Sequence, residues 1–240
     1  MSYDARLMKK IGIDIFSGAG GLSLGGSMAG IKVRYAIEVN PHAAKSFELN
    51  HKGAKVICGD IRDVKAIDFL NKDEEVFIIM GGPPCQGFSI AGPRDMNDKR
   101  NSLYVAMVKL ADRLKPHAVV LENVPGMVQT NGGIGAKRIV EDFKKIGYVM
   151  TPKLLYAPDY GIPQMRKRVF FVGLKDENAE FEFPEGFVEK ENYITCEDAI
   201  SDLPTLQTER GEIIYGDDVQ EYLHEPQSEY QKKMRMSSEK

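Results

Sequence analysis

The sequence predicts an α/β protein, a doubly wound and mostly parallel sheet with helices on both faces. Strand-like and helix-like segments alternate along residues 10–175. The strand-like segments are continuous apolar runs, which is typical of strands that helices cover on both sides. Glycine or proline stands at several of the junctions between segments. Repeated β-α units of this kind form an open sheet between two layers of helices.

Seven segments have the composition of strands. They are residues 11–16, 33–39, 55–58, 76–80, 118–124, 149–156 and 169–173. A parallel pair needs a long crossover connection, usually a helix. The last two strands are joined only by a stretch that carries Pro, Gly and Gln. One of them is therefore expected to be antiparallel.

Helices are predicted between most of these strands. They cover residues 22–29, 41–50, 64–70, 103–114 and 134–146. Gly30 and Gly147 are typical helix ends, and Pro41 suits a first turn. The helix over 103–114 ends before Pro116, which cannot continue a helix. After about Asp176 the pattern weakens and predicts no further element. We therefore expect a main domain over residues 10–175 and an acidic extension over 176–240.

Composition excludes several classes of protein. The chain has 240 residues, a net charge of −3 and three cysteines, Cys58, Cys85 and Cys196. Without a C-x-x-C pair, neither a disulfide framework nor a zinc site is predicted, and no metal is expected. A reducing, cytoplasmic compartment fits best. No apolar run approaches the ~20 residues that span a membrane, so no membrane partner is expected.

The most informative segment is residues 81–89, Gly-Gly-Pro-Pro-Cys-Gln-Gly-Phe-Ser, directly after the apolar run 76–80. It puts Cys85 on a stiffened turn at the end of a buried strand, where open α/β sheets place their chemistry. Burial of a thiol alone would not require two glycines and two prolines before it. The polar, Gly- and Pro-containing stretch 90–102 has the composition of a mobile flap.

Three acidic residues lie at the ends of the first three predicted strands. Asp14 begins a glycine-rich turn that runs to Gly21, Glu38 ends the second strand, and Asp60 follows the third. A carboxylate in the position of Glu38 can accept both ribose hydroxyls of a nucleoside. A dinucleotide fits less well, because the G-x-G-x-x-G frame from Gly18 has Ser23 at its last position. A pocket of carboxylates suits a nucleoside that carries an amino acid, such as S-adenosylmethionine, whose positive charges they attract.

Further polar residues are expected near Cys85. Glu122 ends the fifth strand, which lies next to the fourth in a doubly wound sheet. Gln164, Arg166 and Arg168 alternate as the chain enters the last strand, so they would share one face of an extended segment.

In this order, the segments resemble the DNA (cytosine-5)-methyltransferase family over residues 10–175. The matching positions are 16–21, Glu38, 59–61, 82–86, 100–103, 122–124, Gln164, Arg166 and Arg168. The resemblance implies a Rossmann-like class I methyltransferase fold. It also implies methyl transfer from S-adenosylmethionine to C5 of a flipped-out cytosine in double-stranded DNA, with S-adenosylhomocysteine as the product. The same resemblance implies that the enzyme belongs to a restriction-modification system.

The resemblance also assigns roles to residues. Cys85 would add to cytosine C6 as a thiolate, and Glu122 would contact N3 and the exocyclic amine. Arg166 and Arg168 would position the flipped nucleotide and the nucleophile. The residues expected to surround the cofactor are Asp14, Phe16, Ser17, Gly18, Ala19, Gly20, Gly21, Glu38, Val39, Asp60, Ile61, Pro83 and Leu103.

One departure from the family concerns the C-terminal part. Family members continue into a target-recognition region and return with a further motif, and neither is found here. A split enzyme, a truncated chain and a natural remnant are the three explanations. Each predicts weak activity or none from this chain alone, and the first predicts a second polypeptide that carries the recognition region. The expected setting is the cytoplasm of a bacterium or an archaeon.

Two alternatives remain open. In the first, the chain is a non-catalytic, S-adenosylmethionine-binding subunit that works through a DNA-reading partner. It would methylate transfer RNA if it followed the RNA cytosine-5 enzymes that share this architecture. Methylation of an exocyclic amine is disfavoured, because such enzymes carry an aromatic residue where Cys85 stands.

Overall fold

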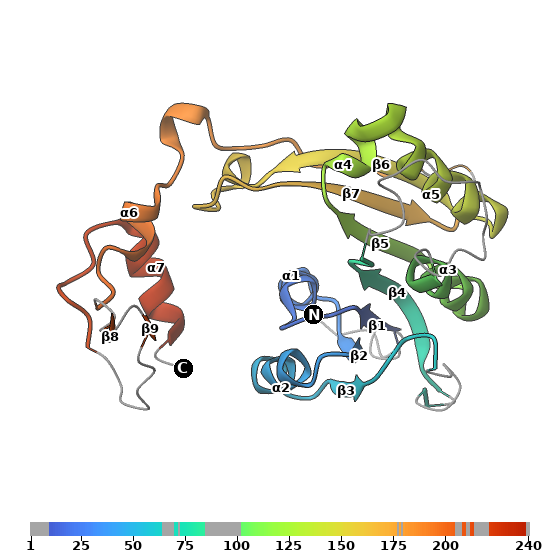
Figure 1. Ribbon diagram of the computed structural model, residues 1–240, viewed down its shortest axis with the longest axis horizontal. Coiled ribbons are helices and arrows are strands. Elements are labelled where there is room, and N and C mark those ends of the chain that lie inside the picture. The colour runs from blue at the N-terminus through green and yellow to red at the C-terminus, as the bar shows by residue number, and fades with distance from the viewer. Residues whose placement is uncertain are drawn as a thin grey trace, which may run out of the picture. The chain divides into compact units, whose positions relative to one another are not determined.

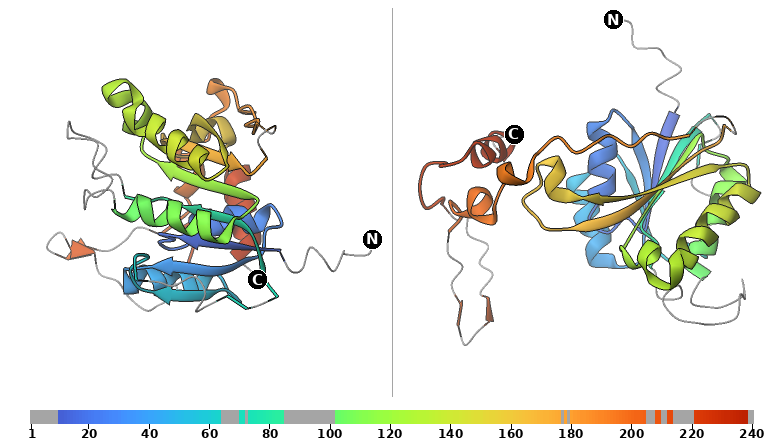
Figure 2. Two further views of the ribbon diagram at one scale, coloured as in Figure 1. Left: turned by 90° about the vertical axis from the view of Figure 1, so that its right-hand side faces the viewer. Right: turned by 90° about the horizontal axis from the view of Figure 1, so that it is seen from above.

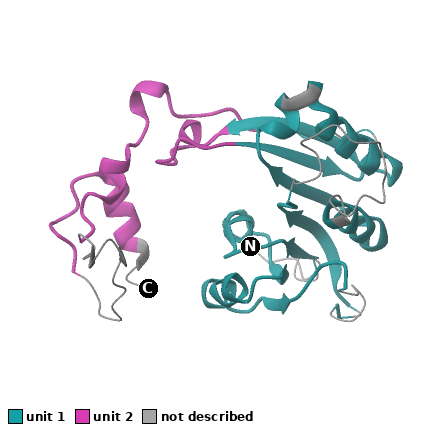
Figure 3. Cartoon of the chain, viewed as in Figure 1, with its two compact units in different colours: residues 1–155, 168–183 teal, residues 156–167, 184–240 magenta. Residues whose placement is uncertain are grey.

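The chain forms two compact units, which Figure 3 shows in different colours. Unit 1 comprises residues 1–155 and 168–183, and unit 2 comprises residues 156–167 and 184–240. The computed structural model describes residues 10–63, 70–71, 73–84, 102–176, 178, 180–204, 208–209, 212–213 and 221–238 (Figure 1).

The main feature of unit 1 is a seven-stranded sheet (Figure 1). Its strands are β1 (Lys10–Ile15), β2 (Val33–Glu38), β3 (Lys55–Cys58), β4 (Glu75–Gly81), β5 (Ala118–Asn123), β6 (Val149–Tyr156) and β7 (Lys167–Leu174). Their order across the sheet is β3-β2-β1-β4-β5-β7-β6. The pairs β1–β2, β1–β4, β2–β3 and β4–β5 are parallel, whereas β7 pairs with β5 antiparallel. The predicted mostly parallel sheet with an antiparallel strand is confirmed.

Helices cover both faces of this sheet (Figure 2). Helices α1 (Gly21–Met28) and α2 (Pro41–Asn50) lie on one face, and α3 (Ser102–Leu114) and α5 (Ile134–Lys145) lie on the other. Successive residues of a strand point to opposite faces. Accordingly, Ile79 joins the larger core cluster with Met107 and Phe143, while Ile78 and Met80 belong to a second cluster. Burial on both sides explains why the strands read as continuous apolar runs.

Local sequence signals set most boundaries of these elements. Helix α2 begins at Pro41, as predicted, because the side chain of Asn40 accepts hydrogen bonds from the backbone N–H groups of His42 and Ala43. Residues 64–69 of the predicted helix 64–70 lie outside the described residues. Helix α4 (Gly126–Gln129) and the 3-10 helix Thr130–Gly133 were not predicted.

Unit 2 contains short elements that the sequence did not reveal. They are the 3-10 helices Ala157–Tyr160 and Lys190–Asn192, the helices α6 (Cys196–Ile200) and α7 (Glu229–Ser238), and the strand pair β8 (Thr208–Glu209) and β9 (Glu212–Ile213). Helix α6 begins with a capping box, in which Thr195 and Asp198 exchange hydrogen bonds. No described helix of the chain is long and apolar enough to cross a membrane.

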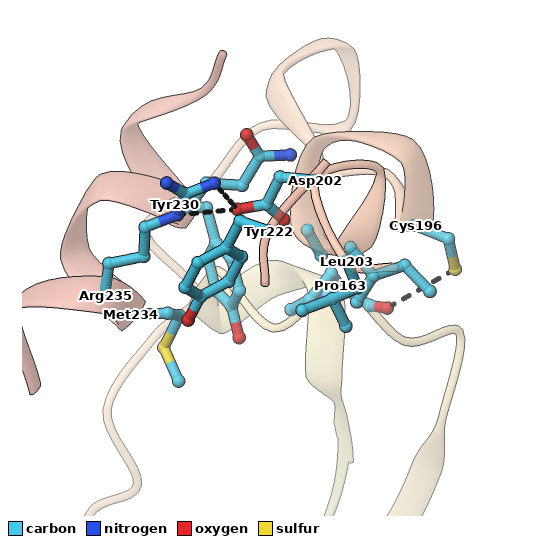
Figure 4. A pocket seen from close by; sticks show the side chains of 11 residues that line it. Pro163, Cys196, Asp202, Leu203, Tyr222, Tyr230, Met234 and Arg235 are labelled. Carbon is cyan, nitrogen blue, oxygen red and sulfur yellow. Dashed lines mark hydrogen bonds and ion pairs between the residues drawn. The ribbon is translucent and has the colours of Figure 1, made fainter. Parts of the chain in front are cut away.

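An ion pair joins Asp202, which lies just after α6, to Arg235 of α7. The guanidinium of Arg235 donates to Asp202 at 2.7 Å and lies 3.7 Å from the centre of the Tyr222 ring. These residues border a pocket of about 440 Å³ that Cys196, Leu203 and other side chains line (Figure 4). Since Asp202 is only 2% exposed, removal of Arg235 would leave a buried charge unpaired.

Candidate functional site

The predicted site residues of unit 1 gather where parallel strands end. We call this end of the sheet, at which β1, β2, β4 and β5 finish, the carboxyl edge. Asp14 of β1 lies beside Ala36 of β2 and Met80 of β4 in the strand register. Because β4 also pairs with β5, it lies between the acidic residues of β1 and β2 and the end of β5.

The glycine-rich turn after β1 has an unusual backbone conformation. Phe16, Gly18 and Gly20 all have positive φ angles, of 56°, 54° and 99°. A Cβ on Gly20 would lie 2.1 Å from Nε2 of His51, so only glycine fits beside α2. Ser17, Ala19 and Gly21 complete the turn, and α1 begins at Gly21. This geometry brings the backbone of the turn close to the end of β2.

Glu38 fixes that turn through its carboxylate. Oε2 accepts a hydrogen bond from the backbone N–H of Gly18 at 2.8 Å, and Oε1 accepts one from Asn40 at 2.8 Å. The end of β2 is thereby tied to the turn after β1. The next residue, Val39, is 65% exposed and lies beside this junction.

Asp14 is a fully buried carboxyl group at the carboxyl edge. Its Oδ2 accepts a hydrogen bond from the hydroxyl of Ser23 at 2.6 Å. Its Oδ1 has no hydrogen-bond partner among the described residues, and the same holds for the buried Oγ of Ser17. Burial raises the pKa of Asp14 to about 6, although the hydrogen bonds from Ser23 act in the opposite direction. Unsatisfied oxygen atoms of this kind fit a ligand that brings N–H or O–H groups.

The raised pKa predicts how Asp14 affects stability. The folded state favours the protonated carboxyl, so this stabilisation is complete below the ordinary pKa of 3.8 and is lost as the pH rises through about 6. Asp14→Asn should therefore raise the free energy of unfolding by about 1–3 kcal/mol near pH 8. The gain should vanish near pH 4.

Urea unfolding of both proteins at several pH values measures this difference. A gain that is independent of pH would contradict the assignment.

Asp60 and Ile61 follow β3, as predicted, but Asp60 has a partner that the sequence did not reveal. The guanidinium Nε of Arg62 lies 2.9 Å from Oδ1 of Asp60, and the pair lowers the pKa of that carboxyl. Ile61 is buried, and the N–H of Gly59 donates to the carbonyl of Glu38. Leu103 of α3 packs against the larger core cluster.

Glu122 and Arg168 contact each other on the side of β4 that lies away from β1, where β5 and β7 pair. Oε1 of Glu122 lies 2.9 Å from Nε of Arg168, and both side chains are about one quarter exposed. The antiparallel pairing of β5 with β7 places Glu122 opposite Phe170 and so brings Arg168 to the carboxyl edge. The position of Arg168 thus depends on the strand order.

Arg166 belongs to unit 2, and its carbonyl accepts a hydrogen bond from the N–H of Ala157 at 2.9 Å. The sequence predicts an extended segment from Gln164 onward, but strand β7 starts only at Lys167. The N–H groups of Gln164 and Arg166 each bond to the carbonyl two residues earlier. Such tight turns interrupt an extended conformation.

The chain leaves β4 through a tightly enclosed turn. A Cβ on Gly81 would lie 2.5 Å from the carbonyl oxygen of Ile15, and one on Gly82 would lie 3.3 Å from Oε2 of Glu122. The carbonyl of Pro83 accepts a hydrogen bond from Asn123 at 3.0 Å. Cys85 and the expected flap up to residue 101 lie outside the described residues.

The close approach of β4 to β1 predicts a strong effect of Gly81→Ala. The added methyl group would force the two backbones apart, and the variant should lose about 1–3 kcal/mol of unfolding free energy. Gly25→Ala in α1 is the matched control, because a Cβ there meets nothing within 4 Å. It should leave stability unchanged or raise it by about 0.5–1 kcal/mol. Equal denaturation midpoints for the two variants would contradict the role of Gly81.

Comparison with known proteins identifies the family. Residues 11–239 match the model of the C-5 cytosine-specific DNA methylase family. The chain is 40% identical over 232 residues to the type II methyltransferase M.DdeI of Desulfomicrobium norvegicum, covering 94% of this chain and 55% of that protein. It is 42% identical over 193 residues to M.MthTI of Methanothermobacter thermautotrophicus, covering 79% and 56%.

A solved structure agrees with these matches. The crystal structure of a DNA modification methyltransferase encoded within a prophage of E. coli has a TM-score of 0.68 and 33% sequence identity, over 80% of this chain and 55% of that one. The chain thus spans about half the length of the relatives it matches. On the match to the family model and to these relatives, the chain belongs to the C-5 cytosine-specific DNA methylase family.

Proposed function

We propose that this chain transfers a methyl group from S-adenosylmethionine to C5 of a cytosine in double-stranded DNA. The observation that carries the proposal is the arrangement at the carboxyl edge. Asp14 and Glu38 lie on one side of β4, the Glu122–Arg168 pair lies on the other, and β4 leads into Cys85. The names of its relatives, type II methyltransferases, support the same reaction.

In this proposal residues 10–175 form the catalytic domain, and the glycine-rich turn holds the cofactor. Glu38 would accept the ribose hydroxyls, and the unsatisfied oxygen atoms of Asp14 and Ser17 would accept N–H or O–H groups. Asp60 and Ile61 would lie at the adenine base of S-adenosylmethionine. The residues around the cofactor would also include Phe16, Val39, Pro83 and Leu103. When bound, S-adenosylmethionine supplies an electrophilic methyl group on a sulfonium.

Cytosine C5 is too electron-poor to accept a methyl group directly, so the protein must activate it. The Cys85 thiolate would add to C6 while Glu122 gives a proton to N3, which makes C5 nucleophilic. After C5 has taken the methyl group, loss of the C5 proton to water expels the Cys85 thiolate, and return of the N3 proton to Glu122 restores the aromatic ring and the acid. Arg168, bound to Glu122 at 2.9 Å, would hold that carboxyl group in place, and Arg166 would contact the nucleotide.

A base in a duplex is out of reach, so the target must be flipped out at a cost of a few kcal/mol. DNA-binding surfaces are usually basic, yet in residues 184–240 acidic side chains outnumber basic ones by more than two to one. This imbalance supports a second polypeptide that carries a basic, DNA-reading region. The names of the relatives support a place in a restriction-modification system.

Transfer of a labelled methyl group tests the proposal. The chain is incubated with methyl-labelled S-adenosylmethionine and either duplex DNA or transfer RNA, with and without the product of the adjacent reading frame. The nucleosides are then separated. Label in 5-methylcytosine from DNA supports the proposal, and label from transfer RNA alone contradicts the DNA substrate. Cofactor binding without label in any arm would favour the non-catalytic subunit.

A further inference from the structure

We propose that Asn123 is a positioning residue, which holds the backbone at Pro83 after the end of β4, two residues before Cys85 in the sequence. The inference rests on the proposed function. Asn123 is the last residue of β5 and is 5% exposed. Its Nδ2 donates to the carbonyl of Pro83 at 3.0 Å, and its Oδ1 accepts from the N–H of Val124 at 2.8 Å. These two contacts fix which way the amide points.

Pro83 needs such an external contact because of its position. Strand pairing of β4 ends at Gly81, and neither Pro83 nor Pro84 has a backbone N–H to donate. Their backbone can therefore form hydrogen bonds only through carbonyl oxygens. Asn123 supplies that contact from a strand 40 residues away in sequence. Cys85 follows two residues after the held carbonyl.

The same contact links the two reacting side chains. Asn123 directly follows Glu122 on β5, and Gly82 directly precedes Pro83. A Cβ on Gly82 would lie only 3.3 Å from Oε2 of Glu122. The Asn123 amide therefore fixes the turn before Cys85 relative to the residue that would protonate cytosine N3. A nucleophile and an acid that act on one ring must be held at a set separation, and small misplacements are costly.

Asn123→Asp separates this role from a general role in folding. Aspartate has nearly the same shape and can still accept from Val124, but its carboxylate cannot donate to Pro83. When protonated, the carboxyl regains one donor. The defect of the variant should therefore shrink as the pH falls, because burial beside a carbonyl raises the pKa of the new carboxyl.

The experiment measures the single-turnover rate at which Cys85 forms a covalent adduct with duplex DNA that contains 5-fluorocytosine. The full chain is used, with its partner polypeptide if one is required. Near pH 8 the Asn123→Asp variant should react about 10²-fold more slowly than the wild type. The ratio of the two rates should return toward one as the pH falls to about 5.5. Affinity for S-adenosylmethionine should stay close to that of the wild type. The melting temperature should be lower near pH 8, because the new carboxylate is buried, and should recover as the pH falls, so both rates are measured well below it.

Asn71→Asp is the matched control. Its Nδ2 donates to the hydroxyl of Tyr35 at 3.4 Å, near the start of β2 rather than at the carboxyl edge. Its rate should equal that of the wild type at every pH. A rate ratio for Asn123→Asp that is independent of pH, or a parallel loss of cofactor affinity, would overturn the inference.

A second measurement keeps the inference separate from the proposed function. If even the wild type forms no adduct, the proposed function fails. Amide hydrogen exchange of Gly82 and of residues 85–88 then tests whether Asn123 holds this turn. The Asn123→Asp variant should exchange at least about 10-fold faster there, with unchanged exchange in β1. Equal exchange in the two proteins would overturn the inference.

Discussion

Glu122→Gln should slow adduct formation at the target cytosine by about 10²–10⁴-fold, the usual contribution of one positioned acid. Glutamine keeps the size of the side chain and can still donate a hydrogen bond, but it cannot pass a proton to N3. It also changes the contact with Arg168, whose Nε lies 2.9 Å from Oε1 of Glu122. The single-turnover rate with 5-fluorocytosine DNA measures the effect, and affinity for S-adenosylmethionine should be unchanged.

Glu75→Gln is the control for this change. Glu75 begins β4, at the end of the sheet opposite the carboxyl edge, and its Oε1 lies 2.7 Å from Nε2 of His117. The substitution also replaces a carboxylate that contacts a polar side chain, but far from the reacting groups. Its rate should match that of the wild type. A Glu122→Gln rate within about 3-fold of the wild type would exclude Glu122 as the proton donor.

Glu38→Ala should weaken binding of S-adenosylmethionine by about 10²-fold or more. The change removes the acceptor for the ribose hydroxyls and also the two hydrogen bonds, each 2.8 Å, that hold Gly18 and Asn40. Hydrogen bonds to a charged group are each worth about 1.5–3 kcal/mol. Glu38→Gln keeps one acceptor oxygen, so its loss of affinity should be intermediate.

Titration calorimetry measures both affinities. Glu48→Ala on α2 is the control, since Glu48 is exposed and pairs only with Lys45 in the described part of the chain. It should bind as the wild type does. If Glu38→Ala also bound normally, the glycine-rich turn would not be the cofactor site.

Most of the sheet could be predicted because its signals are local. The strands β1, β4 and β5 are buried on both faces, and that burial appears in the sequence as uninterrupted apolar runs. The start of α2 follows from Pro41, a local signal that suits a first helical turn. The carboxyl ends of parallel strands meet at one edge, so the neighbourhood of Asp14 and Glu38 also follows from the topology.

Contacts between distant residues could not be predicted in this way. Ser23 was noted only as a departure from a dinucleotide motif, yet its hydroxyl is the partner of Asp14. The pairing of Glu122 with Arg168 requires β7 to lie beside β5, ahead of β6 in the sheet, and no spacing reveals that order. In unit 2, Arg235 of α7 donates a hydrogen bond to Asp202, which lies just after α6 and 33 residues earlier in the sequence. Polar contacts of this range leave no periodic pattern.

Mapping the covalent adduct tests the central claim most directly. The chain is incubated with S-adenosylmethionine and duplex DNA that contains 5-fluorocytosine, and the modified peptide is identified by mass spectrometry. Cys58 and Cys196 are exposed and serve as internal competitors. We expect the nucleotide on Cys85 alone and no adduct with Cys85→Ser. Methylation of cytosine by the Cys85→Ser variant, or an adduct on Cys58 or Cys196 instead, would contradict the account.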